Sequence, residues 1–252
     1  MPSVIIQNQP NLGGNIVILQ SFFNISAQLL FNHTPNHPSQ NSQVRIFYGL
    51  GGPRVRYGGN GLSGFDIDLA AENNDWCRHV YQFSHETCHI LAQFRQQNHC
   101  NQWVEECICE AASLFVLNTL AGMGANNCGP CAGLFTGENP PRPFFIAMLE
   151  YIIGLLYAPE RQFAAMNLAE WRNQHELILR GDPYQRQLNN IVANKLFTFF
   201  TANPTKWAAV QYLNSTPCGP GQDSLHDYLA NWKSATPQTE RGLICDIETL
   251  LL

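Results

Sequence analysis

The sequence has few charged residues and no concentration of basic ones. Asp, Glu, Lys and Arg make up 13% of the 252 residues, and the formal net charge is -5. A protein that binds nucleic acid through its phosphates needs clustered Lys and Arg, so this composition argues against a nucleic-acid partner. With 45% hydrophobic residues, the chain can bury a substantial core, as soluble globular proteins do.

Long apolar runs are also absent. The longest, from Phe144 to Tyr157, is interrupted by Glu150 and is shorter than the roughly 20 residues that span a bilayer. The first residues do not show a basic segment followed by an apolar one, which is the pattern of a secretory signal. The nine cysteines are an odd number, which fits a reducing compartment with mostly buried thiols. We therefore expect a cytoplasmic protein without a membrane segment.

The most informative stretch contains a His-Glu-x-x-His motif. On a helix, His85 and His89 lie one above the other on the same face, where two imidazoles can bind one metal ion. Glu86 would lie beside that metal, and its carboxylate can take a proton from a water molecule that zinc activates. Asp75 or Asn74 is the expected N-cap. A different sector of this helix carries the core-facing residues, which are Val80, Phe83, Thr87, Ile90, Leu91 and Phe94.

A second helix is expected from Trp103 onward. A catalytic zinc usually has three protein ligands and a water, so a further donor must follow the motif. Glu106 and Glu110 lie one turn apart on the same face of this second helix. Two inward-facing carboxylates are costly to bury without a cation. The spacing therefore predicts that the second helix completes a metal site.

These two helices resemble those of the gluzincin group of zinc metallopeptidases, over roughly residues 64 to 120. The resemblance implies one zinc ion per chain, a peptide or protein substrate, Glu106 as the third ligand and Glu110 as the acid that orients a ligand histidine. Glu106 lies slightly nearer to His89 than in the best-known members, and Glu110 replaces the usual aspartate. The reverse assignment, with Glu110 as the ligand and Glu106 as its helper, is therefore the alternative.

A small sheet is expected before the metal helix, which makes the fold class α+β. In gluzincins the edge strand of such a sheet aligns the substrate by strand addition. The resemblance makes Phe65, Ile67 and Leu69 the candidate edge strand. Alternating or turn-bounded apolar segments predict strands at Val4–Gln7, Val44–Tyr48, Val55–Tyr57 and Phe65–Leu69, and helical spacing predicts a helix at Ile16–Phe31.

The rest of the chain is predicted to be helical. We expect a zincin-like N-terminal lobe at residues 1–121 and a helical C-terminal lobe at 122–252, which together form one catalytic unit. The resemblance implies that the second lobe supplies a His or Tyr that stabilises an oxyanion. The candidates are Tyr151, Tyr157 and His226, with His175 and Tyr184. Helices are expected at Phe144–Leu156, Glu160–Arg180, Tyr184–Thr201, Thr205–Leu213, Ser224–Lys233 and Pro237–Leu251.

Two other functions remain open. A zinc-stabilised regulatory or binding protein would need no activity, and Cys88 or Cys100 can close the fourth position of a structural zinc site. Glu86 argues against this function, because a structural zinc site does not require that carboxylate. The third hypothesis is a thiol oxidoreductase.

The thiol hypothesis rests on Cys128-Gly-Pro-Cys131. Redox chemistry needs a low-pKa cysteine at a helix N-terminus that follows a strand, whereas a helix precedes this motif. A structural disulfide, a second zinc site or a plain turn are the other interpretations of the motif. His33 and His37 lie among prolines and are interpreted as ordinary solvated residues.

Overall fold

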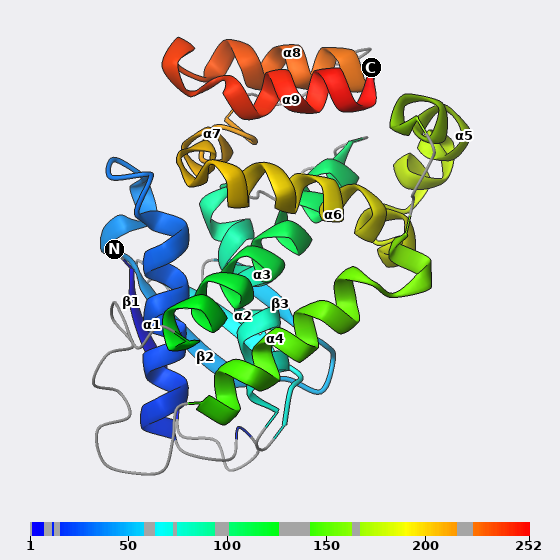
Figure 1. Ribbon diagram of the computed structural model, residues 1–252. Coiled ribbons are helices and arrows are strands. Elements are labelled where there is room, and N and C mark those ends of the chain that lie inside the picture. Colours follow the sequence, from blue (N-terminus) through cyan, green and yellow to red (C-terminus); the bar gives the residue numbers. More distant parts are fainter. Residues whose placement is uncertain are drawn as a thin grey trace. The chain divides into compact units, whose positions relative to one another are not determined.

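The computed structural model describes residues 2–7, 12, 16–57, 64–72, 75–93, 101–125, 142–162, 167–215 and 224–252. It has an α+β fold in which helices predominate (Figure 1). The α-helices are α1 (Ile16–Phe31), α2 (Trp76–Leu91), α3 (Gln102–Ala125), α4 (Arg142–Leu156), α5 (Leu168–Gly181), α6 (Arg186–Ala202), α7 (Trp207–Val210), α8 (Leu225–Ala235) and α9 (Gly242–Leu251). The α+β prediction is therefore confirmed at the level of fold class.

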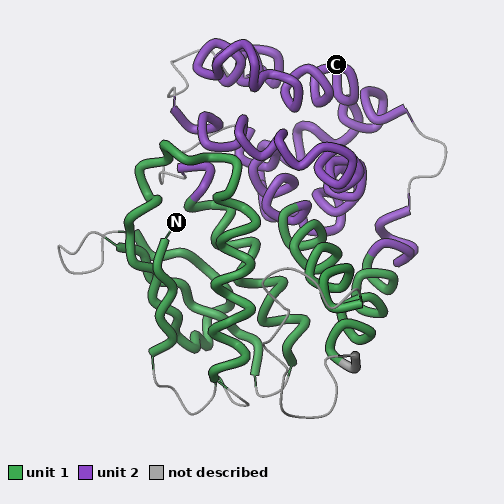
Figure 2. Tube along the Cα trace, turned by 60° about the vertical axis from the view of Figure 1, so that its left-hand side comes forward, with its two compact units in different colours: residues 1–90, 112–155 green, residues 91–111, 156–252 purple. Residues whose placement is uncertain are grey.

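Contacts divide the chain into two compact units (Figure 2). One unit contains residues 1–90 and 112–155, and the other contains residues 91–111 and 156–252. This division differs from the expected boundary at residue 121, because α4 joins the sheet and the first turns of α3 join the C-terminal helices. The local reason is that α3 is a single helix of 24 residues, whose two ends have different neighbours.

The sheet has four strands in the order β1-β2-β4-β3. β1 pairs with β2 and β2 with β4 in parallel, whereas β3 pairs with β4 antiparallel. All four predicted strands are present, at Ser3–Ile6 (β1), Gln43–Tyr48 (β2), Arg54–Tyr57 (β3) and Gly64–Leu69 (β4). The expectation that Phe65, Ile67 and Leu69 form an edge strand is wrong, because β4 lies between β2 and β3.

Charge pairing accounts for the central place of β4. Its Asp66 accepts a hydrogen bond from Arg45 of β2 at 2.7 Å. Its Asp68 accepts hydrogen bonds from Arg54 and Arg56 of β3, both at 2.9 Å. Both aspartates are buried, and a buried carboxylate is costly without a cation. Arginines of both neighbouring strands pair with these carboxylates, since Arg56 of β3 also lies 3.9 Å from Asp66. Alternate residues of the sheet face the core on its other side, where Val44, Ile46, Ile67 and Leu69 are buried.

The two edges of the sheet differ. The outward backbone of β1 is already bonded to α1, because the Gln20 side chain accepts from the Ile6 amide at 3.1 Å and donates to the Val4 carbonyl at 2.7 Å. Such side-chain bonds cover a strand edge that would otherwise pair with another strand. Within the described part of the chain, β3 pairs with β4 alone. The edge at β3 is therefore the one that can accept a further strand.

Aromatic rings and one glutamine join α2 to the rest of its unit. Phe83 stacks on Phe23 of α1, with ring centroids 4.4 Å apart. The side-chain oxygen Oε1 of Gln82 accepts hydrogen bonds from the backbone amides of Ala70 and Ala71, both at 2.9 Å. These residues follow β4 directly, so the bonds fix the connection between the sheet and α2. Because Gln82 is three residues before His85, the same anchor positions the motif.

The helix α3 is the longest helix among the described residues, with 24 residues. By length and composition it is the one helix there that is long and apolar enough to cross a membrane, but 72% of its most apolar window is buried inside the protein. Ala111, Ala112, Leu114, Val116 and Leu117 have no exposed surface. Burial in the core explains the apolar character of α3.

The helices from α5 onward belong to the second unit, and several of their boundaries differ from the predicted ones. The predicted helix at Glu160–Arg180 is a short 3-10 turn at Pro159–Arg161 followed later by α5. Pro204–Lys206 is also a 3-10 turn, and α7 has four residues. Large aromatic side chains fill the core of this unit, in which Trp171, Trp207 and Trp232 are buried.

The contact between α3 and α4 yields a prediction about stability. A Cβ atom at Gly124 would lie 1.7 Å from the Phe145 ring, whereas a Cβ at Gly122 meets nothing within 4 Å. We expect Gly124→Ala to lower the free energy of unfolding by about 1–3 kcal/mol, since the ring must move. Gly122→Ala should raise it by about 0.5–1 kcal/mol, because alanine favours helix. Urea unfolding measures both, and equal effects of the two substitutions would contradict the close packing.

Candidate metal centre

The two histidines of the motif lie on one face of α2. Asp75 caps this helix, because its carboxylate accepts from the Arg78 amide at 3.3 Å, as predicted. Ten residues later, the rings of His85 and His89 have centroids 5.0 Å apart at an interplanar angle of 70°. Successive turns of a helix produce this placement. The motif therefore presents two imidazoles side by side.

Glu86 lies inside the protein. Its exposed fraction is 4%, that of His89 is 8%, and His85 is half-buried. A carboxylate and an imidazole buried next to each other experience a lower dielectric than in water, which strengthens their interaction with any nearby cation. The described residues of the predicted apolar sector are also buried, with Val80 and Phe83 fully covered, while Phe94 lies outside the described part of the chain. Both sectors of this helix are therefore enclosed.

The helix α3 packs against α2 at a defined register. The Ser113 hydroxyl donates to the Tyr81 carbonyl at 2.7 Å, and both residues are buried. One turn further along α2 is His85, and one turn back along α3 is Cys109. Because α3 is one continuous helix, this contact directs Cys109 toward the motif.

A potential metal-binding group results from this register. Ring nitrogens of His85 and His89 and the sulfur of Cys109 all lie within 4.8 Å of one another. Imidazole nitrogen and thiolate sulfur are both zinc donors, and around a tetrahedral zinc such donors are about 3.3–3.6 Å apart. Small side-chain rotations would therefore suffice for these residues to hold one metal ion. The identity of the metal remains a prediction.

The two predicted glutamates are buried on α3 but are not part of this three-residue group. The exposed fractions of Glu106 and Glu110 are 6% and 3%. Glu110 forms ion pairs with Arg186 at 3.4 Å and with Arg161 at 3.9 Å. Burial raises the pKa of Glu110, and the two arginines oppose that shift. Glu110 thus has cationic partners that favour an orienting or structural role over metal ligation.

The first turns of α3 are rich in buried acidic residues. Glu105 is also buried, and its carboxylate accepts from the Asn214 side chain at 2.8 Å. Together with Glu106 and Glu110 it places three carboxyl groups on two helical turns. Two arginines, Arg186 and Arg161, form ion pairs with Glu110, and such pairing lowers the cost of burying its carboxylate.

The predicted oxyanion candidates differ in their surroundings. The Tyr151 ring packs edge-on against Tyr81 at 6.1 Å, one turn before the first motif histidine. Tyr157 has an exposed fraction of 73%, and the His226 side chain is 77% exposed. The His175 ring stacks on Trp171, and Tyr184 is 63% exposed. Contacts within one unit therefore bring Tyr151 toward the motif, and the role of all these residues remains a prediction.

Several other predicted residues have a defined outcome. Cys88 is buried on α2. His37 is buried, and its Nδ1 accepts from the Ser39 amide at 3.0 Å, so its interpretation as a solvated residue is wrong. That bond caps a 3-10 turn, which explains its burial. The residues Cys100, Cys128 and Cys131 lie outside the described part of the chain.

Sequence reasoning missed Cys109 and Arg161. Cys109 lies one turn before Ser113 on α3. Its approach to the histidines follows from the contact between Ser113 and Tyr81, and a sequence pattern does not reveal that contact between two helices. Arg161 is 4% exposed and comes from a 3-10 turn about 50 residues after its carboxylate partner, which no local pattern predicts.

Comparison of the chain with protein-family models, with curated proteins and with solved structures found no match. The function proposed below therefore depends on the residues of this chain alone.

The Glu110–Arg161 pair yields a prediction. We expect Arg161→Met to lower the free energy of unfolding by about 3 kcal/mol at neutral pH, because it leaves a buried carboxylate with fewer cationic partners. Burial raises the pKa of Glu110, so its carboxylate gains a proton on mild acidification. The neutral carboxyl group interacts less strongly with the Arg161 cation. The destabilisation should therefore shrink as the pH falls, which urea unfolding at two pH values measures.

A matched control is Lys233→Met, which removes a more exposed ion pair with Glu248. Exposed pairs contribute about 0–1 kcal/mol, so this substitution should have a small effect. If both substitutions cost the same, or if the effect of Arg161→Met does not depend on pH, the buried pair does not stabilise this unit.

Proposed function

We propose that the protein is a zinc-dependent peptidase. The observation that carries the proposal is the placement of His85 and His89 side by side, with a third donor within 4.8 Å and the buried carboxylate of Glu86 next to them in the chain. Two imidazoles plus one further ligand is the donor set of catalytic zinc sites, which leave the fourth position to a water or a substrate.

The third ligand is Cys109 or Glu106. Cys109 has its sulfur within the three-residue group, whereas the resemblance to gluzincins implies Glu106. Glu110 would then support the site from the same helix, held by Arg161 and Arg186. Both possible ligands are one unit of negative charge when deprotonated, so neither is favoured by charge alone.

The zinc ion, when bound, would supply a Lewis acid that polarises the peptide carbonyl and makes water a stronger acid. Glu86 would then act on the proton. Its carboxylate would accept a proton as water attacks the carbonyl carbon, and would return that proton to the amine that leaves. Burial suits this role, because it raises the strength of hydrogen bonds to the carboxylate and limits competing water. His85 and His89 would hold the zinc ion beside it.

The sheet offers a place for the substrate backbone. β1 is covered by Gln20, and β4 is internal, so we assign substrate alignment to β3. Main-chain hydrogen bonds from an added strand give affinity with little dependence on side chains. A peptide substrate fits this edge better than a small molecule does.

A second candidate function is a non-catalytic protein that zinc stabilises. The thiol of Cys109 in the metal-binding group favours it, because structural zinc sites are rich in cysteine. Such a site needs a fourth protein donor, however, and the group has three donors among the described residues. The carboxylate of Glu86 would also have no task in it.

The first prediction concerns metal and activity together. Purified protein should contain one zinc per chain, and His85→Ala should lose it, because one imidazole donor is gone. Glu86→Gln should keep the zinc and lose peptide cleavage by about 100-fold or more, because it removes the proton acceptor. Elemental mass spectrometry and digestion of an unbiased peptide library measure both properties.

His33→Ala is the control, since His33 lies before the sheet strands β2 to β4 and far from the motif in sequence. It should change neither zinc content nor cleavage. Wild-type protein without zinc would contradict the metal centre. Zinc without cleavage of any library peptide would favour the second candidate function.

A second prediction separates the two possible third ligands. Cobalt(II) in place of zinc should show a thiolate charge-transfer band in the near ultraviolet if Cys109 binds the metal. Cys109→Ser should then remove the band and weaken metal binding, while Glu106→Gln keeps the band. If the band is absent from the wild-type protein and Glu106→Gln releases the metal, Glu106 is the ligand.

A further inference from the structure

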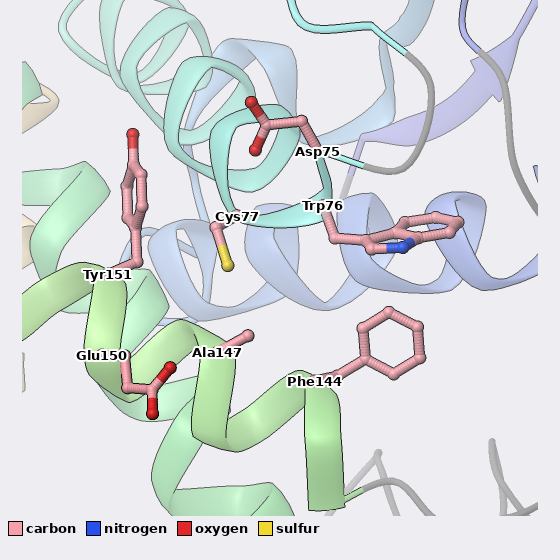
Figure 3. Close-up of a pocket in the computed structure, with 7 residues that line it drawn as sticks. All are labelled: Asp75, Trp76, Cys77, Phe144, Ala147, Glu150 and Tyr151. Atoms are coloured by element: carbon pink, nitrogen blue, oxygen red, sulfur yellow. The ribbon is translucent and has the colours of Figure 1, made fainter.

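A pocket of about 370 Å³ lies between the first turns of α2 and the helix α4, within the sheet-bearing unit (Figure 3). This volume is at the lower end of the range of about 300–1,000 Å³ that ligand pockets cover, so the pocket suits a single side chain. Its lining consists of three aromatic residues, two acids, a cysteine and an alanine, which are Trp76, Phe144, Tyr151, Asp75, Glu150, Cys77 and Ala147.

Ring contacts hold the walls of the pocket in place. Trp76 and Phe144 meet edge to face at 5.4 Å, and Phe22 of α1 touches both rings, at 6.5 and 6.1 Å. At the other end, Tyr151 packs on Tyr81. Aromatic pairs in this geometry add to the stability of packing. The pocket is therefore formed before any ligand arrives.

The charge of the lining has one sign. Asp75 and Glu150 are acids, and neither Lys nor Arg lines the pocket. One oxygen of Asp75 accepts from the Arg78 amide, and the second can still accept from a ligand. Burial and the charge of Asp75 raise the pKa of Cys77 to about 11, so its thiol is uncharged at neutral pH. The lining therefore carries two negative charges beside aromatic faces.

We propose that this pocket binds the guanidinium group of an arginine side chain in the peptide substrate, a proposal that rests on the proposed peptidase function. A guanidinium is planar, stacks on aromatic rings and donates to carboxylates. Trp76 and Tyr151 offer the rings, while Asp75 and Glu150 offer the carboxylates. The pocket thus combines the two kinds of group that recognise arginine.

The place of the pocket on α2 indicates which substrate residue it receives. Cys77, Tyr81 and His85 follow one another at four-residue intervals and therefore lie along one ridge of the helix. Eight residues of helix rise about 12 Å, which an extended peptide covers in three to four residues. The arginine would then lie three or four positions from the cleaved bond.

Binding is tested first, without cleavage. In the Glu86→Gln variant, N-acetyl-arginine amide should shift the indole resonance of Trp76 in an NMR titration, and N-acetyl-citrulline amide, which lacks the charge, should not. Adding Glu150→Gln or Asp75→Asn should weaken binding about tenfold each, since each removes a charged acceptor. Asparagine still caps a helix, so Asp75→Asn preserves α2. Glu160→Gln, an exposed acid outside the pocket, is the control and should have no effect.

Cleavage is tested next with peptides in which one arginine is moved along the chain and compared with citrulline at each position. The proposal expects the arginine peptide to be cut about tenfold faster when the arginine lies three or four residues from the cleaved bond, and expects Glu150→Gln to remove that preference. Equal cleavage of arginine and citrulline peptides by a zinc-loaded, active protein would overturn the proposal.

The two proposals fail in different ways. Arginine binding at Trp76 without zinc or cleavage would contradict the peptidase and leave the pocket as a binding site. Zinc and cleavage with no shift of Trp76, or with equal shifts for arginine and citrulline, would contradict the pocket and leave the peptidase.

Discussion

The burial of α2 beyond its first turn is the constraint on which the rest of the structure depends. A helix that faces solvent can leave its polar residues in water, but α2 buries Val80 and Phe83 on one sector and Glu86 and His89 on another. Each polar group on such a helix needs a partner inside the protein. Gln82 meets this need by binding the two amides after β4, which fixes the helix against the sheet.

The same requirement organises the neighbouring elements. A 2.7 Å bond from Ser113 to the carbonyl of Tyr81 sets the register of α3, and that register brings a thiol next to two imidazoles. On β4, the buried aspartates pair with arginines of the strands on both sides. On α3, the buried carboxylate of Glu110 pairs with Arg161, whose side chain is also buried. The polar interior therefore specifies which segments become neighbours, while the apolar residues supply most of the driving force.

The sequence was sufficient to predict features that depend on local pattern. Helical spacing predicted α1 and the start of α3. The cap of α2 was narrowed to Asp75 or Asn74, because a cap bonds to an amide only two or three residues away. Features that depend on distant partners were not predictable in this way. The edge position expected for β4 was wrong, since alternation identifies a strand but not its neighbours. Cys109 was missed because its role depends on the register between two helices, and His37 was misjudged because a local cap can bury a loop histidine.

The number of donors bears more strongly on function than their identity does. A thiolate and a carboxylate carry the same charge, so exchanging Cys109 for Glu106 leaves the net charge of a zinc centre unchanged. What separates a catalytic from a structural centre is the fourth position, which a structural site closes with protein. Among the described residues the group contains three donors, and the buried carboxylate of Glu86 is adjacent in the chain to one of them. In a site with three protein donors, the fourth coordination position can hold a water molecule. The metal would acidify that water, and the carboxylate of Glu86 would accept its proton. We therefore propose hydrolysis with either third ligand.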